Sequence, residues 1–340
     1  MDNKFKFFKR FTYLVYYVKQ LDTKKFFHFL NYVKTTKKRS SIAILSDAIY
    51  CVFKYNTGLM DYFIFKFYEK DAKDREEWGG TGFLYEYHLI MNPKTTRNIL
   101  ANKIDFFDAY GPFVMHATCT ISDLEIANEK ALKVLNNPKE KIVVKDALGQ
   151  CGWDVEVLSA KDFTVESLCK YMKDKGFNLV EEFVEQHPEL KALSATGLNT
   201  VRIITQLNKN NEVEILGARL RISVNSHVDN LASGNIAAPV NIVTGTVEDT
   251  AVYSDITKRE VENHPVTGMS IIGFQVPLWQ ESIDMVKRAA LHRPENRSIG
   301  WDVAITATGP ELIEGNHNWC KILWQLPVKK GLKKTLYQYL

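Results

Sequence analysis

The sequence predicts a mixed fold of the α+β or α/β class, preceded by a mostly helical region. From about residue 102 onward, short apolar runs alternate with helical patterns, as expected of a mixed α/β domain. Residues 41–100, in contrast, read as mostly helical and are rich in aromatic side chains. With 340 residues, 45% of them hydrophobic, the chain can bury a large core in two or three subdomains.

Residues 3–34 are expected to form two helices that break near Asp22 and Thr23, where the aspartate can cap the second helix. Residues 1–40 carry 11 Lys or Arg against Asp2 and Asp22, so the rest of the chain is net acidic. The apolar stripe of the first helix consists of Phe8, Phe11, Val15, Val18 and Leu21. Such a helix could lie on an anionic membrane surface. The alternative, which is more common, is that the stripe packs on its own protein.

The composition favours a cytoplasmic protein, with peripheral attachment to the inner face of the membrane as an option. The longest early apolar run, Phe11–Val18, has eight residues, whereas about 20 are needed to span a bilayer. Five scattered cysteines form no metal or disulfide pattern. A net charge of +4 does not by itself indicate a nucleic-acid binder, and we expect no nucleic-acid partner.

The segment Lys141–Val157 is expected to be a strand, a glycine loop and a second strand. Lys145 ends the first strand, and Gly149 and Gly152 lie in the loop. Glycines let backbone amides approach phosphate oxygens, and a lysine at the root of the loop can neutralise them. A flexible hairpin turn without a ligand explains the segment equally well.

Arginines project from one face of a predicted strand over residues 213–222. Arg219 and Arg221 are two residues apart, and unpaired arginines are costly to bury. They therefore tend to contact carboxylates or phosphates, which suit the planar guanidinium. The alternative is a pair of salt bridges to Glu212 or Glu214.

A hairpin over Ile299–Asn318 carries the strongest functional signal. Two strand-like runs flank Ala307–Pro310, whose composition favours a turn. A register that pairs Ala304 with Leu312 sets Asp302 opposite Glu314, with Asn316 beside them. Two carboxylates and an amide oxygen on one face suit Mg²⁺. Without other signals, a hairpin whose polar face is solvated is the more common arrangement.

Taken in order, these motifs resemble the ATP-grasp superfamily, and in particular its branch associated with sugar transfer and polysaccharide biosynthesis. The resemblance covers about residues 99–326. It rests on Asn102-Lys103, Lys145 with Leu148–Gly152, Glu181-Glu182-Phe183-Val184, Asn199-Thr200-x-Arg202, Gly217–Arg221, Asp229-Asn230, His264-Pro265, Gly300-Trp301-Asp302 and Glu314-x-Asn316. Two positions depart from the family pattern, namely Asp146 in place of a proline and Asn235 in place of a glycine.

The resemblance implies an ATP-grasp fold, in which two α+β subdomains clamp the nucleotide. The expected divisions are a basic, mostly helical region over residues 1–95, a lid-containing subdomain over 96–190 and a C-terminal subdomain over 191–340. Lys103 and Lys145 are implied to neutralise phosphates, under the glycine loop. The hinge residues implied to hold adenine and ribose are Glu181, Glu182, Phe183, Val184 and Glu185.

The implied function is that of an ATP-dependent carboxylate–amine ligase that acts through an acyl phosphate. Asp302, Glu314 and Asn316 would hold two Mg²⁺, with Mn²⁺ as an alternative. Arg202, Arg219 or Arg221 would hold the acceptor carboxylate and stabilise the transferred group. The expected substrates are a uronic acid, another carboxylated sugar or a nucleotide-sugar, and an amino acid or amine, for a capsule or O-antigen type of glycan.

Three alternatives remain open from the sequence. A non-catalytic ATP-binding protein could pair with a glycosyltransferase through residues 1–40 at the membrane. An enzyme could transfer a phosphoryl group to a sugar hydroxyl. A metal-dependent nuclease could use an Asp…Glu-x-Lys hairpin, but its third residue would be lysine, whereas this chain has Asn316.

Overall fold

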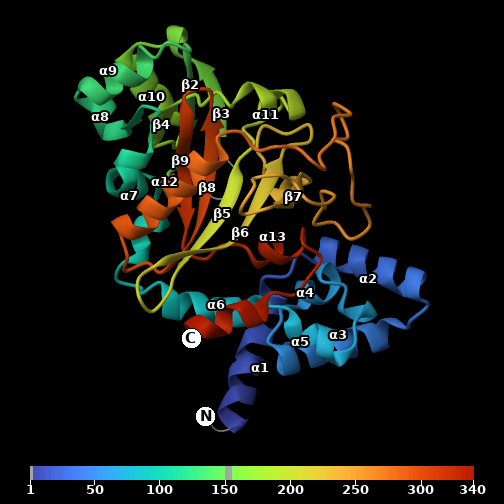
Figure 1. Ribbon diagram of the computed structural model, residues 1–340. Helices are drawn as coiled ribbons and strands as arrows, with labels where there is room; N and C mark the ends of the chain where they lie inside the picture. The colour runs from blue at the N-terminus through green and yellow to red at the C-terminus, as the bar shows by residue number, and fades with distance from the viewer. Residues whose placement is uncertain (1–2, 150–154) are drawn as a thin grey trace.

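The computed structural model describes residues 3–149 and 155–340, which form two antiparallel sheets and a helical region (Figure 1). Gly152 therefore lies outside the described residues. The mixed class and the preceding helical region confirm the fold that the sequence predicted. The boundaries proposed at residues 95 and 190 stay predictions.

The helical region contains helices α1 to α6. Their bounds are α1 Asn3–Lys19, α2 Thr23–Lys37, α3 Ser41–Tyr55, α4 Leu59–Ile64, α5 Ala72–Glu77 and α6 Thr81–Met91. Asp22 caps α2 as expected, because its side chain accepts a hydrogen bond from the amide of Lys25 at 3.0 Å. Aromatic and aliphatic side chains of α2, α3 and α4 build a separate core around Phe29, Tyr62 and Phe63.

The first sheet has the strand order β1-β4-β2-β3 and carries helices on one face. Its strands are β1 Thr118–Thr120, β2 Lys141–Lys145, β3 Val155–Ser159 and β4 Leu179–Glu182, and the accompanying helices are α8 Ile121–Glu125, α9 Glu129–Leu135 and α10 Val165–Lys175. Ile142, Val144 and Val180 pack against these helices. Because side chains alternate along a strand, Lys145 and Glu181 point to the opposite face.

The second sheet has the order β7-β6-β5-β8-β9 and holds the largest core. Its strands are β5 Val201–Leu207, β6 Val213–Ile222, β7 Ile236–Val240, β8 Ser298–Thr306 and β9 Gly309–Asn316. The accompanying helices are α7 Lys103–Tyr110, α11 Pro188–Leu193, α12 Trp279–His292 and α13 Lys321–Gln325. Trp301 and Val286 lie in this core, so α12 covers the face of the sheet that Trp301 occupies.

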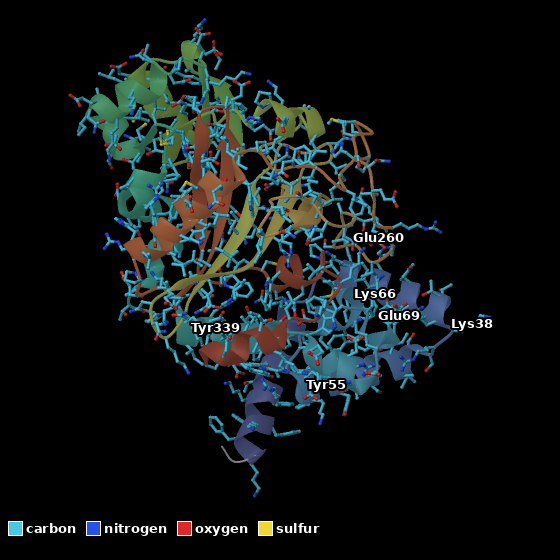
Figure 2. The ribbon with its side chains drawn as sticks, viewed as in Figure 1. Lys38, Tyr55, Lys66, Glu69, Glu260 and Tyr339 are labelled. Carbon is cyan, nitrogen blue, oxygen red and sulfur yellow. The ribbon has the colours of Figure 1, made fainter. Side chains whose placement is uncertain are left out.

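The end of the chain returns to the helical region. The 3₁₀ helix Lys333–Tyr339 lies beside α6, and Figure 2 labels Tyr339 at its end. Tyr339 donates a hydrogen bond to Glu214 on β6. Gln325 of α13 bonds both the amide and the carbonyl of Gly79, at 2.8 and 2.9 Å. The helical region is thereby attached to the second sheet through the last residues of the chain.

A buried ion pair reinforces this attachment. Asp61 of α4 is 2% exposed and pairs with Lys321 of α13 at 3.2 Å. The same carboxylate accepts hydrogen bonds from the amides of Gly58 and Thr81 and from the Thr81 hydroxyl. Lys321 therefore supplies the positive charge for a carboxylate that has little contact with water.

The apolar stripe of α1 does not pack on the protein as the more common alternative expected. Phe8, Phe11, Val15 and Val18 are exposed, whereas Leu21 is half-buried against the helical core. In the described part of the chain, no helix has the length and apolar character needed to cross a membrane.

We predict that Lys321→Met lowers the free energy of unfolding by about 3 kcal/mol, because Asp61 then keeps a buried charge without its cation. Urea unfolding followed by circular dichroism measures the change. Lys334→Met is the matched control, since its ion pair with Glu77 is solvated and its loss should leave the urea midpoint unchanged. Equal midpoints for the two variants would contradict the prediction.

Candidate functional site

Four charged side chains form one row across the second sheet. Asp302 lies opposite Glu314 on one side and Arg202 on the other, and Arg202 lies opposite Arg219. The expected pairing of Asp302 with Glu314 is confirmed. The expected pairing of Ala304 with Leu312 is wrong, since Ala304 lies opposite Glu311. A bulge at Ile313 shifts the register after Asp302.

Asp302 is a buried carboxylate held by two arginines. Its Oδ1 accepts from Arg202 Nε at 2.6 Å, and its Oδ2 accepts from Arg202 Nη2 at 2.9 Å and from Arg221 Nη1 at 2.7 Å. The positive charges of both arginines outweigh the effect of burial and lower the pKa of Asp302 to about 2. Asp302 is therefore ionised at neutral pH.

Arg221 joins this carboxylate to a second one. Its Nη2 lies 2.7 Å from Asp229 Oδ1, and Asp229 Oδ2 accepts from the amide and the hydroxyl of Thr200, at 2.8 and 2.5 Å. The salt bridges to Glu212 or Glu214 that the sequence left open are absent from the contacts of Arg221 in the described residues. Asp229, which lies in a loop, therefore fixes the position of Arg221.

Arg219 occupies the same sheet face but has different partners. Its guanidinium donates to the main-chain carbonyls of Trp324 and Ala218, and the side chain is 3% exposed. Burial lowers the pKa of Arg219 to about 10. Of the three candidate arginines, Arg202 and Arg221 donate hydrogen bonds to Asp302, whereas Arg219 donates to the main-chain carbonyl of Trp324 in α13.

Glu314 and Asn316 complete the predicted triplet on β9. Burial, together with the negative charge of Asp302, raises the pKa of Glu314. With its amide oriented to satisfy both neighbours, Asn316 donates to Glu314 Oε1 and accepts from Arg202 Nη2, each at 3.2 Å. The triplet and Arg202 therefore form one connected polar cluster.

Gly300 makes room for this cluster. A Cβ at this position would lie 2.6 Å from the Cβ of Trp319 and 3.1 Å from the Cδ of Arg202. A side chain at position 300 would therefore clash with Trp319 and press on Arg202. The requirement explains the glycine in the motif Gly300-Trp301-Asp302.

The donor set suits a hard divalent cation only in part. A carboxylate has about four lone-pair sites, and arginine donors use three of those on Asp302. One lone pair of Asp302, the carboxylate of Glu314 and the amide oxygen of Asn316 remain as oxygen ligands. No group of three His, Cys, Asp or Glu side chains suited to a metal occurs in the described ranges. A bound Mg²⁺ would therefore need oxygens from a ligand such as phosphate.

Lys103 begins α7 and is fixed to the loop that follows β2. Asn102 caps the helix by accepting from the amide of Ile104 at 2.9 Å. The Lys103 amide donates to Ala147 at 3.2 Å, and its Nζ donates to the carbonyl of Gly149 at 2.6 Å. Burial lowers the pKa of Lys103, and the nearby charge of Lys145 adds to the effect, whereas Glu314 opposes it. The charge of Lys103 therefore interacts with the charges of Lys145 and Glu314.

Lys145 ends β2 and pairs with a buried glutamate of β4. Its Nζ lies 2.5 Å from Glu181 Oε1, and both side chains are more than nine-tenths buried. On its other side, Glu181 lies 3.9 Å from His116 Nε2. A buried lysine that depends on one carboxylate is held in a fixed position.

His116 connects this pair to the second sheet. Its Nδ1 lies 2.6 Å from Glu311 of β9, and the same carboxylate oxygen accepts from the amides of Met115 and His116. The His187 amide also donates to Ile305 of β8 at 2.6 Å. Sequence reasoning missed both contacts, because nothing local marks a pairing between residues 116 and 311.

The predicted hinge residues follow Glu181 at the end of β4. Glu182 accepts from the amide of Ala117 and pairs with Lys139 at 3.2 Å. The Phe183 amide donates to Lys141 at 3.1 Å, and Val184 is buried. Glu185 is exposed and pairs with Lys191 at 2.9 Å. These residues connect the first sheet to α11 and the second sheet.

The two departures from the family pattern have structural functions here. Asp146 accepts from the Leu148 amide at 3.2 Å and from Asn178 at 3.1 Å, so it shapes the start of the glycine loop. Asn235 accepts from the Val224 amide and donates to the carbonyls of Val228 and Asn230, which closes the loop that carries Asp229.

The sequence matches the model of a protein family described as sugar-transfer associated ATP-grasp, over residues 83–339. The match begins within α6 and includes both sheets. Residues 1–82, with α1 to α5, lie outside it. No curated protein matches the sequence.

Several solved structures share part of the fold. A D-cycloserine synthetase has a TM-score of 0.43 at 9% identity, over 75% of this chain and 78% of its own. An ADP complex of N5-carboxyaminoimidazole ribonucleotide synthetase has a TM-score of 0.39 at 12% identity, over 65% of this chain and 45% of its own. A biotin carboxylase from Campylobacter jejuni has a TM-score of 0.43 at 10% identity, over 72% and 47%. The chain thus spans less than half the length of the last two.

We predict opposite stability effects for the two carboxylates of the row. Asp302→Ala should lower the free energy of unfolding by about 3 to 5 kcal/mol, because two buried arginines lose their shared counter-ion. Glu314→Gln should raise the urea midpoint of the ligand-free protein, because it removes a negative charge that burial and Asp302 disfavour. Urea unfolding measures both, and a Glu314→Gln variant as unstable as Asp302→Ala would refute the charge assignment.

Proposed function

Because the chain belongs to the sugar-transfer associated ATP-grasp family, we propose that it is an ATP-dependent carboxylate–amine ligase. The carboxylate would belong to a uronic acid or another carboxylated sugar, and the amine to an amino acid or a simple amine. The observation that supports this most directly is the row of Glu314, Asp302 and Arg202, with Lys103 near enough to Glu314 for their charges to interact.

The reaction requires activation, because a carboxylate is a poor electrophile and its oxide a poor leaving group. In the first step, an oxygen of the acceptor carboxylate attacks the γ-phosphorus of ATP, the bond to the β-phosphate oxygen breaks, and ADP leaves. In the second step, the amine nitrogen attacks the acyl carbon, the acyl–oxygen bond breaks, and phosphate leaves with the loss of a proton from nitrogen. Phosphoryl transfer of this kind depends mainly on position and on charge neutralisation.

Lys103 and Lys145 are proposed to neutralise the phosphates of ATP. Lys103 already holds the loop at Gly149, and Lys145 is fixed by Glu181, so both ammonium groups are positioned before ATP arrives. Gly149 and Gly152 would let the loop backbone approach the phosphates. The hinge residues Glu181 to Val184 would hold adenine, and Glu185 would contact the ribose.

Arg202 and Arg221 are proposed to stabilise the charge on the transferred group and to hold the acceptor carboxylate. Both are buried and fixed on Asp302, so their guanidinium groups need little reorganisation when charge develops. Arg219 is the weaker candidate, because it donates to main-chain carbonyls beside α13.

Asp302, Glu314 and Asn316 would hold Mg²⁺ together with phosphate oxygens, with Glu314 as the bridging ligand if two ions bind. The ion would supply charge neutralisation at the β- and γ-phosphates. Within the protein, the neutral amide of Asn316 fits this position, because it accepts from Arg202 without adding a third negative charge. The nuclease alternative would require a lysine there.

We predict that the protein releases ADP and phosphate only when both a carboxylated sugar and an amine are present. Hydroxylamine should replace the amine and give a hydroxamate, which mass spectrometry detects. Glu314→Gln should lower the rate at least about 100-fold, because several kcal/mol of charge stabilisation are lost. Lys161→Gln, exposed and remote on the first sheet, is the matched control.

Other outcomes would replace the proposal. Binding of ATP–Mg²⁺ without turnover across carboxylated nucleotide-sugars and amino acids would identify a non-catalytic partner of a glycosyltransferase. A stable phosphosugar would identify phosphoryl transfer to a hydroxyl. If ATP–Mg²⁺ leaves the melting temperature unchanged, nucleotide binding itself is refuted.

A further inference from the structure

One face of α1 packs on the protein, so the opposite face is directed away from it. Leu14 and Tyr17 contact the helical core, and Tyr13 stacks edge-on against Tyr85 of α6. Arg10 pairs with Glu86 of the same helix at 2.9 Å. At 3.6 residues per turn, these positions occupy one side of α1, so the other side points away from the body.

The outward face of α1 is apolar. Its exposed fractions are 66% for Phe8, 50% for Phe11, 42% for Val15 and 56% for Val18, and Phe5 is exposed as well. Figure 1 shows the first turns of α1 extending beyond the other helices. Large apolar side chains that gather on one exposed face indicate an interaction site.

The apolar surface continues onto α3. Phe7 stacks on Phe53 with ring centroids 5.0 Å apart. Ile49, one turn before Phe53 on the same side of α3, is exposed, and so is Ile42 two turns further back. The surface therefore spans two helices, which a single stray hydrophobic residue would not explain.

The charges around this surface favour a lipid over a protein. Helix α1 contains Lys4, Lys6, Lys9, Arg10 and Lys19 and has no acidic residue. Helix α2, the next helix along the chain, has four lysines and no acidic residue. Protein interfaces are depleted of lysine in their centre, whereas interfacial helices combine aromatic and aliphatic residues with many bases.

We infer that α1 binds an anionic phospholipid surface, lying in the plane of the membrane. Phe5, Phe8, Phe11, Val15 and Val18 enter the boundary between head groups and acyl chains, while Lys6 and Lys19 contact lipid phosphates. Lys9, like Arg10, pairs with Glu86 instead. Each lysine near such a surface adds to the attraction, and salt screens it. The inference does not depend on the proposed reaction, because α1 lies outside the residues that match the family.

The test is co-sedimentation of the full chain with vesicles. Wild-type protein should bind vesicles of phosphatidylglycerol and phosphatidylcholine at least tenfold more tightly than vesicles of phosphatidylcholine alone, and 0.5 M NaCl should weaken binding. The triple variant Phe8→Gln, Phe11→Gln, Val15→Gln should lose binding tenfold or more. Its residues are exposed, so circular dichroism and the melting temperature should match wild type.

Two further variants make the test specific. Ile126→Gln with Val243→Gln removes equally exposed apolar residues elsewhere and should bind vesicles like wild type. Lys6→Gln with Lys19→Gln should weaken binding to anionic vesicles alone. The inference is overturned if wild type ignores anionic vesicles, or if the triple variant still binds them. It is also overturned if that variant only dissociates a dimer in size-exclusion chromatography, since a second copy would then occupy the face.

Discussion

The buried carboxylate of Asp302 determines how the candidate site is built. Its two oxygens hold Arg202 and Arg221 in place, and Asp229 and Thr200 hold Arg221 from the other side. A buried charge persists only when it is paired, so each member of this chain depends on its neighbours. As a result, the guanidinium groups of Arg202 and Arg221 are held in place by contacts within the protein, which is what the proposed electrostatic stabilisation at low reorganisation cost needs.

The same dependence joins the two sheets. Lys145 comes from the first sheet and the carboxylates from the second, and neither sheet alone brings both charges together. His116 and Glu311 connect the two sheets. One carboxylate oxygen of Glu311 binds the Met115 amide and the His116 ring, and that ring lies beside Glu181 of the first sheet. Lys103, at the start of α7, adds a contact to the loop after β2.

Local patterns in the sequence were enough to predict the strands of the Ile299–Asn318 hairpin and the pairing of Asp302 with Glu314. Alternation along two strands sets Asp302 opposite Glu314, and the structure confirms it. The bulge at Ile313 was not predictable, because no glycine or proline marks it. The sequence places Arg219 and Arg221 on one face of the sheet, because they are two residues apart on a strand. It does not predict their partners, which are the Trp324 carbonyl for Arg219 and the Asp302 carboxylate for Arg221. Long-range pairs such as Asp61 with Lys321 leave no local pattern at all.

Helix α1 also shows what a local sequence pattern leaves open. The periodicity of its apolar residues predicts an amphipathic helix, but it does not say what covers the apolar side. The structure shows which side of α1 is covered, because Leu14 and Tyr17 pack against the helical core. The larger stripe, with Phe8 and Phe11, remains exposed next to bases. An exposed aromatic stripe costs free energy in water, and the proposed lipid surface would offset that cost.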